Sequence, residues 1–155
     1  TCYQLVGVSS RDYLPKIAEA LKLLRIKRAV VVVGEDGLDE VTLTGVTHAL
    51  VVEDAIPPLE IIPEDYGFRR CTLAELRGGT PGENAEITLE ILQGKPGPKR
   101  DVVLLNAGVA LFACGKAATV AEGVEMARHS LDSGRAYQKL QALRDARRSI
   151  QDSAK

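Results

Sequence analysis

The sequence predicts an α/β fold in which a partial open sheet is flanked by helices. Two apolar runs, at residues 4–8 and 29–33, have the composition of buried strands. A segment with apolar residues at helical spacing lies between them, and from residue 83 onward the pattern is helical throughout. Alternation of strand and helix followed by helices is typical of an α/β unit.

Length and composition limit what the protein can be. The 155 residues suit a single domain portion, with a strand-and-helix half at 1–77 and a helical half at 78–155. A formal net charge of −1 excludes a nucleic-acid or membrane partner recruited by bulk charge. The longest apolar stretch, 102–114, is interrupted by Asn106 and is too short to span a bilayer. Three cysteines without paired spacing and the absence of a signal peptide favour a cytoplasmic protein.

The first half predicts a βαβ unit. Residues 4–8 form the first strand, and Ser9 or Ser10 then offers an N-cap for a helix. We expect that helix to end at residues 27–28, where two cations suit the negative end of the helix dipole. Residues 29–33 are apolar and mostly β-branched, which predicts a strand buried on both faces after a right-handed crossover.

Shorter elements follow. Residues 41–43, 48–52 and 59–62 predict three brief strands in a small meander attached to the main sheet. The second half predicts four helices, the last with Leu140 and Leu143 on its apolar face. The N-terminal signals of these helices are, in chain order, the turn at Gly78–Gly82, Asp101, the capping-box pair Thr119 and Glu122, and Ser133.

The segment GEDGLDEVTLTG, residues 34–45, directly follows a predicted buried strand and contains four carboxylates within six residues: Glu35, Asp36, Asp39 and Glu40. In open α/β sheets, ligands bind at the carboxyl ends of strands. Neighbouring carboxylates repel one another, and a hard divalent cation relieves that repulsion. Adjacent Asp39 and Glu40 can both reach one ion, or two ions side by side, but the spacing is not that of an EF-hand. The charge pattern alone favours a solvated loop and leaves a metal site open.

No other motif predicts chemistry. The amides of the Gly78–Gly82 turn can hold an anion, but the turn lacks the lysine of a phosphate-binding loop. The simpler interpretation is a loop that leads into a helix. His48 and His129 have no partner at metal-ligand spacing and are interpreted as structural. Without a nucleophile elbow or a cysteine–histidine signature, no catalytic residue can be named.

The acidic segment resembles the GLDE motif of the anthranilate phosphoribosyltransferases. The resemblance continues in order through GTPGENA (79–85), residues 97–117 and residues 122–144. It covers only the carboxyl-terminal half of that family, without the amino-terminal helical domain and the glycine-rich loop that holds phosphoribosyl pyrophosphate. The fold it implies is the carboxyl-terminal part of the nucleoside phosphorylase/phosphoribosyltransferase α/β domain.

The resemblance implies a site and a reaction. Asp39 and Glu40 would bind the Mg²⁺ that accompanies the diphosphate, while the amine of anthranilate displaces pyrophosphate from phosphoribosyl pyrophosphate in tryptophan biosynthesis. It implies no general base among the residues present. The chain departs from the family at Val33, where histidine is usual, and at Val46, where proline is usual. Neither departure touches the carboxylate pair.

Two further expectations follow from the partial match. The isolated chain should be inactive, and its sheet should have an unpaired edge that associates with the missing amino-terminal half or with another copy. A non-catalytic binding or assembly module with this fold is the alternative function. The GLDE segment fits a pyrimidine nucleoside phosphorylase less well than an anthranilate phosphoribosyltransferase.

Overall fold

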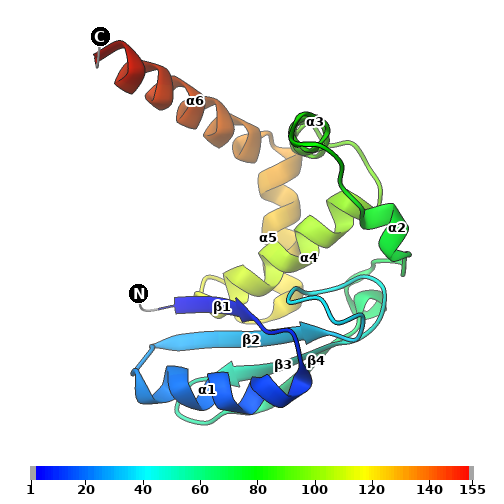
Figure 1. The fold of residues 1–155 in the computed structure, drawn as a ribbon, viewed down its shortest axis with the longest axis vertical. Helices are drawn as coiled ribbons and strands as arrows, with labels where there is room; N and C mark the ends of the chain where they lie inside the picture. The colour runs from blue at the N-terminus through cyan, green and yellow to red at the C-terminus, as the bar shows by residue number, and fades with distance from the viewer. Residues whose placement is uncertain (1–2, 154–155) are drawn as a thin grey trace.

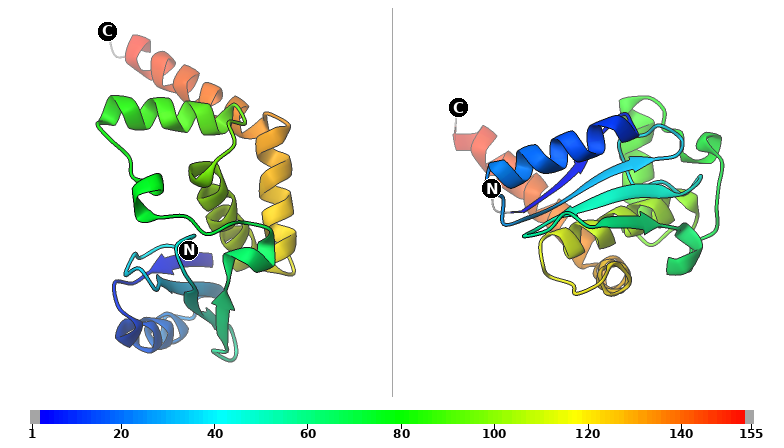
Figure 2. Two further views of the ribbon diagram at one scale, coloured as in Figure 1. Left: turned by 90° about the vertical axis from the view of Figure 1, so that its right-hand side faces the viewer. Right: turned by 90° about the horizontal axis from the view of Figure 1, so that it is seen from below.

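The structure, a computed structural model, describes residues 3–153 and the side chains of residues 3–150. Its centre is a four-stranded mixed sheet in the order β1-β2-β3-β4 (Figure 1). One face is covered by α1 (Leu14–Leu23), and the other by α4 (Pro98–Ala113) and α5 (Val120–Asp132) (Figure 2). The predicted α/β class is therefore confirmed.

The sheet combines one parallel pair with an antiparallel meander. β1 (Tyr3–Gly7) is parallel to β2 (Arg28–Gly34), and α1 connects them as the βαβ pattern predicts. β3 (Thr47–Val52) is antiparallel to both β2 and β4 (Pro58–Ile61). Six of the seven residues of β2 are buried, because this strand has a neighbour on each side and helices on both faces. β1 and β4 are the edges.

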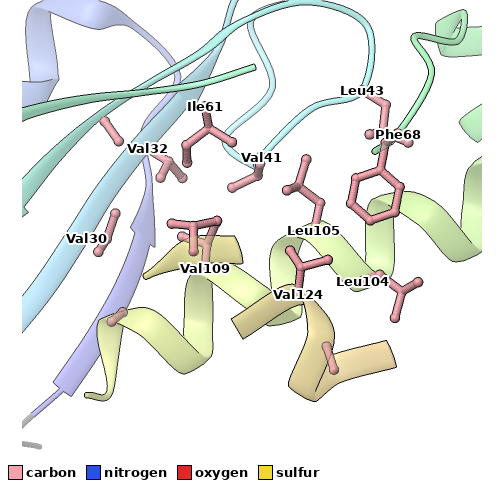
Figure 3. Close-up of a cluster of buried hydrophobic side chains, with 14 of the residues drawn as sticks. Val30, Val32, Val41, Leu43, Ile61, Phe68, Leu104, Leu105, Val109 and Val124 are labelled. Carbon is pink, nitrogen blue, oxygen red and sulfur yellow. The ribbon is translucent and has the colours of Figure 1, made fainter. Parts of the chain in front are cut away.

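Each face of β2 contributes to a separate core. Ala29, Val31 and Val33 face α1, whereas Val30 and Val32 face α4 and α5. Figure 3 shows the core on the α4 and α5 side, in which Val41 from the acidic loop lies near Leu105 and Val109 of α4, and Leu43 lies beside Phe68. The loop after β2 is thus anchored in the same core that holds the helices to the sheet.

The two outer helices are packed differently. α3 (Pro81–Leu92) and α6 (Arg135–Ser153) lie on the side of α4 and α5 away from α1 (Figure 1). α3 contains no buried residue, and residues 141–150 of α6 are all exposed. The apolar face predicted for α6 is therefore only partly covered: Leu143 is 68% exposed and Ile150 71%. Among the described residues, no helix has the length and apolar character needed to cross a membrane.

Two predicted boundaries near the sheet are wrong. α1 ends at Leu23, and Arg25 adopts a positive φ of 56°, so the cations at 27–28 end no helix and Arg28 begins β2. Residues 41–43 form no strand. All three are buried, and the apolar–polar–apolar alternation that imitates a strand comes from a loop whose Val41 and Leu43 side chains fill the core.

Several helix ends also differ from prediction. α4 begins at Pro98 with Gly97 as its N-cap, so Asp101 lies inside the first turn. Ser133 closes α5 and does not open α6. Thr119 does cap α5 by accepting from the Glu122 N–H, but the Glu122 carboxylate accepts from Ala118 and completes no capping box. Three short elements were not predicted: η1 (Arg11–Tyr13), η2 (Pro63–Tyr66) and α2 (Leu73–Leu76).

The crossing of α4 and α5 depends on two glycines. A Cβ built on Gly123 would lie 2.2 Å from the Gly108 carbonyl oxygen, and one on Gly108 would lie 2.7 Å from the Val124 backbone nitrogen. Real carbon atoms do not approach backbone atoms so closely, so a methyl group at either position would force the helices apart. This close contact holds α4 and α5 together against the sheet.

Gly123→Ala should therefore lower the free energy of unfolding by about 1–3 kcal/mol, the range for overpacking a tight interior. Thermal or urea unfolding followed by circular dichroism measures the change. Gly82→Ala is the matched control, since Gly82 is also helical and a Cβ there meets no atom within 4 Å. Equal stabilities of the two variants would contradict the crossing described here.

Candidate metal site in the acidic loop

The acidic loop crosses the end of the parallel strand pair. It begins at Gly34, the last residue of β2, and passes over Gly7, the last residue of β1. A Cβ on Gly7 would lie 1.6 Å from the carbonyl oxygen of Asp39, so the loop backbone rests directly on the glycine. The loop therefore lies where α/β sheets usually bind ligands.

Asp36 is used inside the loop. Its Oδ2 accepts hydrogen bonds from the hydroxyls of Thr42 (2.5 Å) and Thr44 (2.7 Å), and its Oδ1 accepts from the Leu38 N–H (3.1 Å). Burial alone would raise the pKa of Asp36, but these hydrogen bonds to the charged form outweigh it and the pKa is lowered. Asp36 is thus an ionised anchor for the loop.

Glu35 is also occupied. Its Oε2 accepts from the Val46 N–H at 2.9 Å, and its Oε1 lies 3.7 Å from His48 Nε2. His48 Nδ1 in turn lies 3.4 Å from Glu60 on β4, which gives the histidine a place between two carboxylates. Within the part of the chain that the structure describes, no three histidine, cysteine or acidic side chains form a group that could hold a metal ion.

Asp39 and Glu40 differ from the other two acids of the loop. Both are exposed, and neither carboxylate has a hydrogen bond or ion pair with another described residue. The chain on either side is fixed, by Gly7 beneath Asp39 and by buried Val41 after Glu40. The loop therefore presents two adjacent free carboxylates on a well-anchored backbone. Oxygen donors of this kind fit Mg²⁺, which usually takes one or two carboxylates and keeps waters or substrate phosphates as its other ligands.

Asn106 of α4 is a site residue that sequence reasoning missed. Its Oδ1 accepts from the Val41 N–H at 3.1 Å, and its Nδ2 donates to the Val41 carbonyl at 2.7 Å. In the sequence it is visible only as the polar residue that interrupts an apolar run. The available signal was a polar residue inside an apolar helix, because such a side chain needs hydrogen-bond partners when it is buried.

The other sequence-predicted features lie in different surroundings. In the Gly78–Gly82 turn, the Gly79 N–H donates to Asn84 and the Thr80 N–H donates to Glu83, both in α3. These two amides are therefore already satisfied by the start of the helix and are not available to an anion. His129 lies in the last turn of α5.

The two departures from the family pattern have physical consequences. Val33 is buried in the core beneath α1, where it packs without needing a polar partner. Val46 supplies the N–H that binds Glu35, which a proline at this position could not do. The loop of this chain is thus closed by a hydrogen bond that depends on the departure at Val46.

Comparison with known proteins identifies the family of the chain. A family model described as "Glycosyl transferase family, a/b domain" matches residues 1–137. The chain is 60% identical over 143 residues to the anthranilate phosphoribosyltransferase of Desulfitobacterium hafniense (strain DSM 10664 / DCB-2), covering 92% of this chain and 43% of the relative. It is 50% identical over 141 residues to that of Bacillus cereus (strain B4264), covering 90% and 41%. The chain therefore spans less than half the length of these relatives.

Solved structures give the same result. Anthranilate phosphoribosyltransferase from Thermus thermophilus superposes with a TM-score of 0.81 at 40% identity, over 88% of this chain and 40% of that one. The enzyme from Saccharomyces cerevisiae in complex with PRPP and Mg superposes with a TM-score of 0.82 at 28% identity, over 90% and 41%. Because the family model covers most of the sequence and the fold agrees, the chain belongs to the glycosyl transferase family defined by this α/β domain.

Proposed function

We propose that this chain is the carboxyl-terminal portion of an anthranilate phosphoribosyltransferase and that Asp39 and Glu40 are its Mg²⁺ ligands. The observation that carries the proposal is the division within the acidic loop. Glu35 and Asp36 accept hydrogen bonds within the loop, whereas Asp39 and Glu40 are exposed at the end of the parallel strands and have no partner among the described residues. A relative that is 60% identical bears this enzyme's name, and one related structure has PRPP and Mg bound.

The chemistry of the two carboxylates suits the reaction. The amine of anthranilate would displace pyrophosphate from the anomeric carbon of phosphoribosyl pyrophosphate, in the cytoplasmic pathway to tryptophan. When bound, Mg²⁺ would supply positive charge beside the oxygens of the leaving pyrophosphate. Asp39 and Glu40 would hold that ion at the carboxyl end of β1 and β2, with the diphosphate completing the oxygen ligands.

Two other functions remain as alternatives. A non-catalytic module would keep the fold for binding or assembly and would have no use for free carboxylates at this position. A pyrimidine nucleoside phosphorylase of similar fold is less favoured, because the similar proteins named above are anthranilate phosphoribosyltransferases. The flanking reading frame discriminates between enzyme and module: an upstream glycine-rich substrate loop supports the enzyme.

Removing the two carboxylates should weaken metal binding by the assembled enzyme. We expect Asp39→Asn/Glu40→Gln to raise the Mg²⁺ or Mn²⁺ concentration for half-maximal rate at least tenfold, because the variant keeps the shape of both side chains but loses both charges. Metal titration of the full-length enzyme with substrate measures this. Glu53→Gln/Asp54→Asn is the control for the change in charge, since it removes an adjacent acidic pair just after β3, at the opposite end of the sheet, where Glu53 pairs with Arg28 at 2.8 Å. Equal metal dependence in the parent and the site variant would contradict the assignment of Asp39 and Glu40 as metal ligands.

The isolated chain should not catalyse the transfer. It spans about 40–43% of its relatives' length, and both substrates must be held in orientation for the displacement to proceed. A fluorescence assay that follows anthranilate consumption, with the complete enzyme as positive control, tests this expectation. Measurable turnover by the purified 155-residue chain would show that the acidic-loop half alone carries the chemistry.

The exposed edge of the sheet at β1 is expected to pair with another strand. Among the described residues, β1 pairs with β2 alone, and all five residues of β1 are partly exposed. We therefore expect the chain to self-associate at micromolar concentration, or to be stable only beside a complementary amino-terminal fragment. Light scattering measures the association. Leu143→Lys/Ile150→Lys tests the other exposed apolar surface, on α6, and a monomer produced by this variant would contradict association through β1.

A further inference from the structure

We infer that Asn106 is a positioning residue for the metal ligands, in that its amide sets the location of the Asp39–Glu40 carboxylates from the far side of the loop. The inference rests on the proposed function of these carboxylates. Asn106 itself forms no hydrogen bond with either carboxylate; it binds the backbone of Val41, the residue that follows Glu40.

The contact is a double backbone clamp between distant parts of the chain. Asn106 Oδ1 accepts from the Val41 N–H at 3.1 Å, and Nδ2 donates to the Val41 carbonyl at 2.7 Å, across 65 residues of sequence. The second N–H of the amide donates to the Val102 carbonyl in the preceding turn of α4, at 2.9 Å. Both amide hydrogens and the amide oxygen are therefore used.

Only an amide of this length satisfies all three contacts. The site asks for one acceptor and two donors, which is what a carboxamide offers and what a carboxylate or an alkyl group does not. Asparagine is a weak helix former, so its presence in the middle of a largely apolar helix needs such a compensation. The three bonds also fix the orientation of the amide, because a flipped group would place its oxygen against two carbonyl oxygens.

The contacts of Asn106 fix the acidic loop relative to α4. Leu105 and Val109 of α4 are fully buried in the core below the sheet, so Asn106 has little freedom to move. Val41 is itself 0% exposed, and the peptide that it shares with Glu40 is the one whose N–H the clamp holds. With Gly7 beneath the Asp39 carbonyl, the two proposed ligands lie between two fixed points.

The test measures Mn²⁺ binding to the chain and hydrogen exchange of the Val41 amide. Mn²⁺ binding is followed by electron paramagnetic resonance, and exchange by NMR. We expect Asn106→Ala to expose the Val41 amide to exchange and to weaken Mn²⁺ binding about tenfold, the lower limit for groups outside the ligand shell. Asn106→Ser is the second variant, since serine can still bond Val102 within the helix but cannot reach Val41. It should reproduce both effects even where the alanine variant folds poorly.

The control is Asn84→Ala. Asn84 makes the same kind of clamp, accepting from the Gly79 N–H at 2.8 Å and donating to its carbonyl at 3.1 Å, but at the start of α3. It should leave Mn²⁺ affinity and Val41 exchange unchanged. Parent-like Mn²⁺ affinity in both Asn106 variants, or an equal loss in Asn84→Ala, overturns the inference. A parent that binds Mn²⁺ no better than Asp39→Asn/Glu40→Gln overturns the proposed metal site and the inference with it, so the two failures are distinguishable.

Discussion

The burial of Val41 and Leu43 beneath the acidic loop is the interaction on which the rest of the structure depends. Both side chains are fully buried between the sheet and α4 (Figure 3). Burying a valine or leucine contributes about 1.5–3 kcal/mol each, which offsets the conformational entropy of ordering the few residues around them. Without these anchors, a loop that holds four carboxylates would be driven apart by their repulsion. With them, the same charges can be kept in one defined arrangement.

Electrostatics divides the four carboxylates into two that build the loop and two that face solvent. Burial opposes the ionised form of Asp36, but the hydroxyls of Thr42 and Thr44 donate to it and its pKa is lowered in the folded state. A group whose pKa is lower in the folded state stabilises the fold above its unfolded pKa and loses that contribution as the pH falls through the folded value. The internal hydrogen bonds of Asp36 therefore stabilise the loop more at neutral than at acidic pH.

Sequence reasoning succeeded where one physical signal dominated. The run at 29–33 is apolar enough that only burial on both faces explains it, and β2 agrees. It failed where two signals look alike. Alternation at 41–43 is the same whether a strand or a buried loop anchor produces it, and Asp101 resembles an N-cap although Gly97 takes that place.

The identity of Asp39 and Glu40 as the free pair rests on the family resemblance and on tertiary contacts, because charge pattern alone cannot tell them from Glu35 and Asp36. Asn106 could not be assigned, since its partner lies 65 residues away.

The candidate site and the uncovered sheet edge are physically linked. Gly7, which supports the Asp39 carbonyl, is the last residue of β1, and within the described part of the chain β1 pairs with β2 alone. The other support, Asn106, belongs to α4, which is locked to α5 by the Gly108–Gly123 contact and buried against the sheet. Of the two proposed ligands, Glu40 is therefore supported by a rigid helix and Asp39 by an edge strand. Because an edge strand opens more easily than a buried helix, a partner strand that pairs with β1 would further restrain Gly7 and, through it, the backbone that carries Asp39.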